Sequence, residues 1–184
     1  MTSSSSGLRD AFTCALDMTR EFKGDRMGLV GYGVIERFDQ YGESNLLVPF
    51  ANIITDTGDL FYGNRANLVA TTALTGMQAG SGGATAVAKS GVGSAIVTLL
   101  AGQAFDATFP SVTNLGAGLG VQVVFKTTYA AGTATGTVSE ATLTNGVIGT
   151  ASTAANTIAR IAFTGIVKGA LDSLVITWNH KFLG

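Results

Sequence analysis

The chain has very few of the residues from which disulfides, metal sites and most active sites are built. Its 184 residues include one cysteine, Cys14, and one histidine, His180. A single cysteine excludes an intrachain disulfide. A lone cysteine and a lone histidine also exclude the Cys/His frameworks that hold zinc. We therefore expect no disulfide and no metal centre.

Charge is also scarce over most of the chain. Residues 1–65 carry nine acids and six bases, whereas residues 66–184 carry eight charged side chains: Lys89, Asp106, Lys126, Glu140, Arg160, Lys168, Asp172 and Lys181. An active site normally needs several ionisable groups that converge on one pocket. The composition therefore argues against an enzyme. It favours a surface of hydroxyls, amides and methyl groups in permanent contact with other proteins.

The sequence has neither a basic excess nor a long apolar run. Its formal net charge is −1 and its pI is near 5.7, so we expect no nucleic-acid partner. Mean hydropathy is positive at +0.37, but the best apolar run, residues 94–104, falls well short of the roughly 20 residues of a membrane span. The N-terminus lacks the pattern of a signal peptide. We expect synthesis in the cytoplasm and no membrane partner.

Residues 1–33 are predicted to form an N-terminal arm that is helical in part or extended. Leu8, Phe12, Leu16 and Phe22 fall near helical spacing, with charged residues elsewhere on the wheel. This stripe fits two arrangements, packing on its own domain or docking on a neighbouring subunit. Our hypothesis is an anchoring arm that binds an adjacent subunit through these four residues and is mobile in the isolated protein.

Residues 34–184 are predicted to form an antiparallel β-sandwich or jelly-roll body, which makes the chain mainly β. A hairpin is predicted at the start of this body, with strands at 34–38 and 46–54 joined by a turn at 39–42. Pro49 places the second strand at an edge or a bend. Thr55 or Asp56 caps a short helix. Residues 66–77 form an ambiguous apolar stretch, and residues 79–83 are expected to be a flexible loop.

The second half alternates short strands with Gly-rich turns, which is typical of a sandwich. Strands are expected at residues 94–100, 121–129, 137–144 and 157–164, with a loop at 145–155. In the last strand one face carries Leu174, Ile176, Trp178, His180 and Phe182. The position of His180 beside Trp178 and Phe182 favours a structural role for this residue over a catalytic one.

No motif of known chemistry is complete. Residues 116–120, Gly-Ala-Gly-Leu-Gly, lack the G-x-G-x-x-G spacing and precede a strand, and the chain has no G-K-[ST]. Asp56 and Asp59 suit helix capping better than calcium binding. Glu36 and Asp39 flank a turn and are more simply solvated than catalytic. We therefore predict no catalytic, cofactor-binding or metal-binding residues and no cofactor.

Three segments together are similar to one known family. They are residues 34–39 with 52–62, residues 126–135, and the set 155–160, 168–174 and 176–184. The terminal run Trp-Asn-His-Lys-Phe-Leu-Gly is the most specific. In this order, across residues 34–184, the chain resembles a family of tailed-bacteriophage virion proteins, and residues 1–33 have no counterpart.

The resemblance implies a non-enzymatic structural component of a phage particle, located in the virion. Similar proteins occur as capsid cement or decoration proteins and as tail- or fibre-associated proteins. The leading hypothesis is a cement protein, a homotrimer that bridges and stabilises major capsid subunits. The alternative is a tail or fibre protein that attaches to the host surface, with a glycan pocket in the loops at 80–83 or 145–155.

Overall fold

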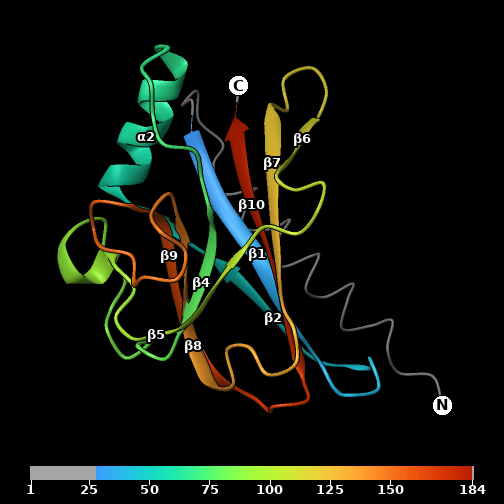
Figure 1. The fold of residues 1–184 in the computed structure, drawn as a ribbon. Helices are drawn as coiled ribbons and strands as arrows, with labels where there is room; N and C mark the ends of the chain where they lie inside the picture. Colours follow the sequence, from blue (N-terminus) through green and yellow to red (C-terminus); the bar gives the residue numbers. More distant parts are fainter. Residues whose placement is uncertain (1–27, 184) are drawn as a thin grey trace.

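The chain folds into two five-stranded antiparallel sheets packed face to face (Figure 1). The computed structural model describes residues 28–183. Sheet A contains, in spatial order, β2 (Ser44–Ala51), β1 (Gly28–Phe38), β10 (Ser173–Leu183), β7 (Val121–Tyr129) and β6 (Ser111–Asn114). Sheet B contains β3 (Ile53–Ile54), β9 (Thr157–Lys168), β8 (Gly136–Thr144), β4 (Gly76–Gly80) and β5 (Leu99–Ala104). The predicted mainly β, sandwich fold is confirmed.

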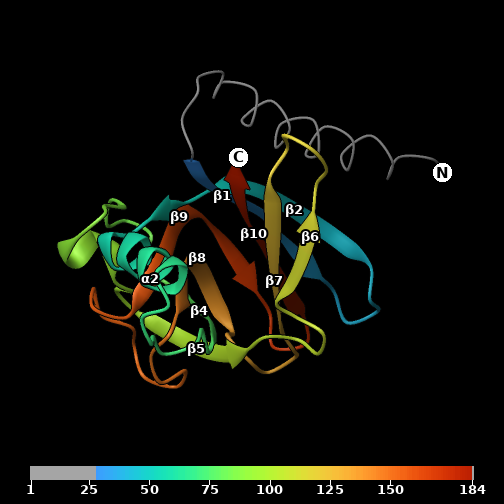
Figure 2. The same ribbon diagram turned by 90° about the horizontal axis from the view of Figure 1, so that it is seen from above.

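Residues 28–183 include two short helices beside the sheets. The helix α2 (Asp56–Ala66) follows β3, and the 3-10 helix η1 (Gly91–Ser94) lies between β4 and β5. Figure 2 shows the two layers from above, with α2 beside β9. Thr55 caps α2 as predicted, because its Oγ1 accepts from the Gly58 N–H at 2.9 Å. The helix extends to Ala66 and is longer than the sequence indicates.

The core lies between the sheets, and the last strand supplies its centre. Leu174, Ile176, Trp178 and His180 are fully buried, as the predicted alternation of β10 requires. The Trp178 ring meets the edge of Phe50, with ring centroids 5.1 Å apart. β10 pairs with β1 on one side and β7 on the other, so the final strand is the middle strand of sheet A.

The strand predicted at residues 46–54 is in fact two strands in different sheets. β2 ends at Ala51, which pairs with Tyr32 of sheet A. β3 begins at Ile53, which pairs with Arg160 of sheet B. The chain crosses between the sheets at Asn52, and local alternation does not reveal such a crossing. The prediction for Pro49 is confirmed, because β2 is an edge strand.

The flexible loop predicted at residues 79–83 is wrong over its first half. Gly76–Gly80 is the buried strand β4, paired with β5 and β8. A Cβ on Gly76 would lie 2.2 Å from the Gln103 carbonyl oxygen, and one on Gly80 would lie 2.4 Å from the Thr98 carbonyl oxygen. Here the glycines permit close packing of neighbouring strands. From composition alone, the same glycines indicate a flexible loop.

Three further strand boundaries and one short strand differ from the sequence prediction. The strand expected at 94–100 lies at Leu99–Ala104, because the segment before it forms η1 and a connection. The short edge strand β6 is not predicted. β1 begins at Gly28, so residues 28–33, predicted to belong to the arm, pair with β10 in sheet A. Strand β9 also continues to Lys168, beyond the predicted 157–164.

Candidate interaction surface

A fully buried ion pair lies on the outer side of sheet B. Arg160 of β9 donates to Glu140 Oε2 of β8 through Nη2 at 2.8 Å and through Nε at 3.2 Å. Neither side chain has exposed surface. The two residues are diagonal neighbours, because Arg160 pairs with Thr142 and a β-bulge shifts the register beside Glu140. A buried pair of this kind persists only when its remaining donors and acceptors are also satisfied.

The β4–β5 connection, residues 81–98, supplies those partners. The Arg160 guanidinium donates to the carbonyl oxygens of Gly93 at 3.1 Å, Thr85 at 3.2 Å, and Gly82 and Ala86 at 3.4 Å. Glu140 Oε1 accepts backbone N–H groups from Gly82 at 2.8 Å, Thr98 at 2.9 Å and Val97 at 3.1 Å. The ion pair therefore fixes an irregular connection against the sheet.

A second connection, residues 145–156, covers the neighbouring part of the same face. Gln78 of β4 donates through Nε2 to the carbonyl oxygens of Ile148 at 3.0 Å and Thr150 at 2.6 Å, and its Oε1 accepts from the Ser152 N–H at 2.9 Å. A Cβ on Gly102 of β5 would lie 1.8 Å from the Ile148 carbonyl oxygen. The connection therefore rests directly on β4 and β5.

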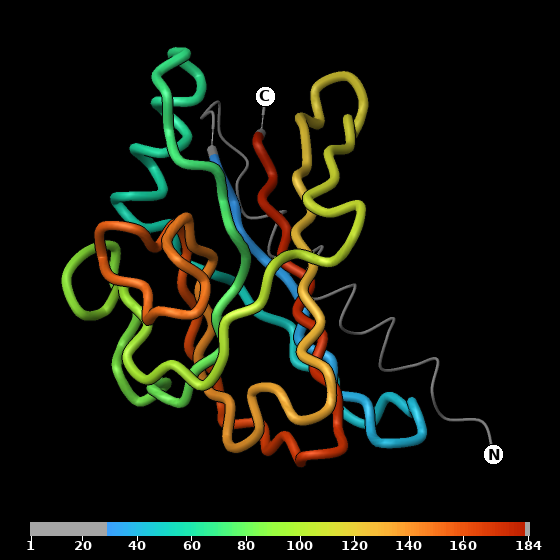
Figure 3. Tube along the Cα trace, viewed as in Figure 1, coloured from blue at the N-terminus to red at the C-terminus, as the bar shows by residue number. Residues whose placement is uncertain are grey.

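The two sheets thus differ in how the described chain covers them. Figure 3 traces the connections 81–98 in green and 145–156 in orange, and Figure 2 shows the orange one on the side of sheet B away from sheet A. Within residues 28–183, neither connection lies over the outer face of sheet A (Figure 2). We call this surface the sheet A outer face and treat it as the candidate interaction surface.

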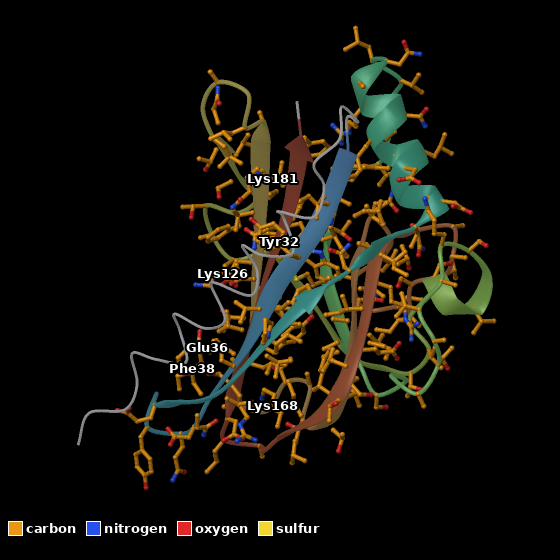
Figure 4. The ribbon with its side chains drawn as sticks, turned by 180° about the vertical axis from the view of Figure 1, so that it is seen from behind. Tyr32, Glu36, Phe38, Lys126, Lys168 and Lys181 are labelled. Carbon is orange, nitrogen blue, oxygen red and sulfur yellow. The ribbon has the colours of Figure 1, made fainter. Side chains whose placement is uncertain are left out.

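The sheet A outer face combines apolar and polar side chains. Figure 4 views it directly, with Tyr32 and Glu36 of β1, Lys126 of β7 and Lys181 of β10 labelled. Tyr32 Oη donates to Gln122 Oε1 at 2.8 Å, and Gln122 Nε2 donates to Asn179 Oδ1 at 3.0 Å. Strand alternation places four more apolar side chains on this face, opposite the core residues: Val34, Leu47, Val124 and Val175.

His180 lies in the core and not in an open site. Its Nδ1 is 2.5 Å from Tyr62 Oη, and its ring meets the Phe125 ring with centroids 5.4 Å apart. Burial lowers the pKa of His180 to about 3 and raises the pKa of Tyr62. Such an imidazole stays neutral near pH 7, which fits the structural role expected for it.

Three acidic residues weighed as site residues from the sequence have structural partners: Asp39, Asp56 and Asp59. Lys89 forms an ion pair with Asp59 at the start of α2, and its ammonium lies 3.9 Å from Asp56. Asp39 Oδ1 accepts the N–H groups of Tyr41 at 2.9 Å and Glu43 at 3.0 Å, which closes the β1–β2 turn. Among residues 28–183, no group of three or more His, Cys, Asp or Glu side chains is placed to hold a metal ion.

Sequence reasoning did not single out the buried charges. Besides Glu140 and Arg160, Lys168 is buried, and its ammonium donates to the carbonyl oxygens of Ala130 at 3.1 Å and Asp172 at 2.6 Å. Burial lowers the pKa of this amine. Arg160 is recognisable in the sequence as a charge inside the apolar run at residues 158–163 of β9. Glu140 lies among Ser, Thr and Ala in β8, and Lys168 is the last residue of β9, so neither has such a signal.

Two further predictions concern the apolar stripe of the arm and the loops considered for glycan binding. Leu8, Phe12, Leu16 and Phe22 lie outside the described residues, so their partner-binding role stays a prediction. The two loops proposed as alternative glycan sites are only partly loops on the surface, and glycan binding by either stays a prediction. Gly80 belongs to β4, and residues 145–156 direct polar groups toward sheet B.

Comparison with known proteins gives no relative. No protein-family model, curated protein or solved structure matches the chain. The resemblance to phage virion proteins therefore stays a prediction. Across residues 28–183, no helix has the length and apolar character to cross a membrane.

Proposed function

We propose that this protein is a non-enzymatic structural subunit of a tailed-bacteriophage particle, and specifically a cement protein on the capsid. The observation that carries the proposal is the use of the buried ionisable side chains. Glu140, Arg160 and Lys168 tie backbone segments to the sandwich, and His180 sits against Tyr62 in the core. These groups hold the fold of the subunit together, which supports a structural role for them over a catalytic one.

The sheet A outer face, together with the chain that precedes β1, forms the attachment side in this proposal. Sheet B has its outer face occupied by its own connections, which leaves the opposite side for partners. That side mixes valines with Thr177, Gln122 and two lysines, a composition suited to a partly polar protein interface. Copies related by a closed symmetry axis, such as the expected homotrimer, would bury further low-charge surface.

A cement protein acts by binding the assembled shell and not its dissociated subunits. Its stabilising effect then follows mass action and saturates when all sites are filled. The test uses shells purified without this protein, to which the full chain is added back. We expect saturable binding to shells and a higher shell disruption temperature. Binding to tails or host cells without binding to shells would overturn the proposal.

The alternative function, a tail or fibre component that attaches to the host, predicts a different outcome of the same experiment. It requires binding of the purified protein to host cells or to surface glycans, with no effect on the shell. The expected oligomer is tested separately by sedimentation of the full chain. A trimer supports self-association, and a monomer at every concentration would contradict it.

A further inference from the structure

The strand β6 forms one edge of sheet A and pairs on one side alone within residues 28–183. It is the last strand in the order of that sheet, and its neighbour is β7, with Val112 opposite Val123 and Thr113 opposite Gln122. Figure 1 shows β6 at the margin of the molecule, beside β7. The free side of an edge strand presents backbone N–H and C=O groups that can bond to a further strand.

Two residues of β6 direct their backbone groups away from β7. The Leu115 N–H donates to the Gly120 carbonyl oxygen at 3.0 Å, which makes these two residues a hydrogen-bonded pair. Along an antiparallel ladder such pairs alternate with pairs that share no hydrogen bond. Thr113 therefore bonds to β7, whereas the N–H and C=O groups of Val112 and Asn114 face outward.

The other edge strands of the two described sheets are interrupted or short. β2 contains Pro49, which has no N–H, and pairs with β1 through a β-bulge. β3 is two residues long. β5 has a β-bulge against β4, and its last carbonyl oxygen, at Ala104, accepts from Thr127 Oγ1 at 3.4 Å. Such features discourage pairing between edges, whereas Ser111–Asn114 has no proline, no charged side chain and no bulge.

Val112 is an apolar side chain that the described chain leaves uncovered on the inner face of sheet A. It is paired with Val123, and paired residues share a face. Val123 lies on the same side of β7 as the buried Phe125. Even so, Val112 is 69% exposed. A further strand beside β6 would remove part of this apolar surface from water.

We propose that β6 pairs antiparallel with β6 of a second copy of this chain, about a twofold axis at Val112. The two Val112 residues then exchange two backbone hydrogen bonds and bring their side chains together. On the other face, Ser111 lies opposite Thr113 of the second copy, a favourable pair of hydroxyl side chains. Residues 107–120 carry no charge, so no like charges meet. The edge is therefore its own complement, as a twofold contact requires.

The contact is small, which determines its strength. About four residues of each copy take part, far fewer than the roughly 20–30 residues a side of a stable interface. We therefore expect a weak dimer that dissociates at the dilute concentrations of unfolding experiments. Copies held side by side on a surface would pair more readily, because their effective concentration is higher. The inference goes beyond the proposed function and does not depend on it, and in the expected homotrimer the same contact would join two trimers.

Disulfide trapping tests the contact and its register in the full-length protein. A Cys14→Ser background leaves each variant with a single thiol. Val112→Cys places that thiol at the axis, where the paired Cα atoms lie about 5.5 Å apart, within the range of a disulfide. Thr113→Cys is the matched control, on the next residue and also exposed. Its two copies lie about 8 Å apart across the axis, beyond the reach of a disulfide.

Under mild oxidation at high protein concentration, Val112→Cys should form an interchain disulfide at least about tenfold faster than Thr113→Cys does. Peptide mass identifies the product. Equal rates for the two variants, or no interchain product, would overturn the proposal. A faster reaction of Thr113→Cys would place the axis elsewhere and would overturn it as well.

Sedimentation equilibrium supplies an independent measurement on the unmodified chain. We expect an even-numbered assembly at high concentration. Val112→Pro removes an outward N–H and leaves the ladder to β7 intact. It should halve the assembly and raise its dissociation constant by about tenfold or more, because two hydrogen bonds are lost across the axis. Val112→Thr keeps the N–H and should still pair. A monomer or an isolated trimer at every concentration, or unchanged association of Val112→Pro, would overturn the proposal.

Discussion

Trp178 of sheet A donates its indole N–H to Asn52 Oδ1 at 3.0 Å, at the residue where the chain crosses into sheet B. Trp178 is fully buried, and Asn52 N in turn donates to the Gly31 carbonyl oxygen at 3.0 Å. One hydrogen-bonded unit therefore joins β1, β10 and the crossover. This unit fixes the point at which the chain passes from sheet A to sheet B.

Replacement of Trp178 by Ala should lower the free energy of unfolding by about 3–5 kcal/mol, because it opens a cavity in the core. Trp178→Phe should cost less, since the phenyl ring refills part of that volume. Urea denaturation followed by circular dichroism measures both. Val112→Ala, at a side chain 69% exposed, is the control and should change stability by under about 0.5 kcal/mol. If Trp178→Ala lowers the free energy of unfolding as little as the control does, the position of Trp178 in the core is contradicted.

Gly31→Ala should destabilise the protein by about 1–3 kcal/mol through overpacking. A Cβ at Gly31 would lie 1.8 Å from Asn52 Oδ1, so Asn52 must move and the Trp178 hydrogen bond must lengthen or break. Gly63→Ala is the matched control, because Gly63 is in α2 and a Cβ there meets nothing within 4 Å. The control should stabilise by about 0.5–1 kcal/mol. Equal melting shifts for the two variants would argue against the described packing around Asn52.

Arg160→Met or Glu140→Gln alone should each cost about 3–5 kcal/mol, because each leaves the partner buried without its counter-charge. The double variant should lose less than the sum of the two, as for any interacting pair. The exposed Lys89–Asp59 pair supplies the control. Both side chains are more than half exposed, at 54% and 52%, and Lys89→Met should cost less than about 1 kcal/mol. Additive losses at Glu140 and Arg160 would show that the pair is not coupled.

The stability of the protein should fall as the pH drops below about 6.5, the usual pKa of an unfolded histidine. Burial lowers the pKa of His180 to about 3 in the folded chain, so over this range protons bind the unfolded state and not the folded one. From pH 7.5 to 5.5 this single group should remove about 1.4 kcal/mol. His180→Gln should abolish that slope in thermal or urea unfolding.

Because His180 is the single histidine of the chain, its NMR signal reports this titration without overlap. The imidazole chemical shift in the folded protein should stay constant over the same pH range. A midpoint near 6.5 would show that the ring is solvated and would contradict its burial against Tyr62.

The sequence predicts those elements whose own pattern determines their environment. The alternation of β10 identifies Leu174, Ile176 and Trp178 as core residues, and Thr55 is recognisable as a cap from its place before an acidic first turn. β4 is missed because Gly76–Gly80 has the composition of a loop. Only the distance to neighbouring strands distinguishes a tightly packed glycine from a mobile one.

The candidate surface depends on information that no local pattern contains. The contact between Glu140 and Arg160 follows from the β8–β9 register and its bulge, and the two residues are 20 positions apart. The sheet A outer face is recognised only when the strand order is known and both connections are seen on sheet B.

The central claim, the proposed assignment to the capsid of a phage, is tested most directly by a search for this protein in purified particles. A reconstruction of the virion should show the ten-stranded sandwich as a repeating density on the outer surface of the shell, with sheet A toward the major capsid protein. Density for the sandwich at the tail alone, or its absence from purified particles, would contradict the assignment as a capsid cement protein.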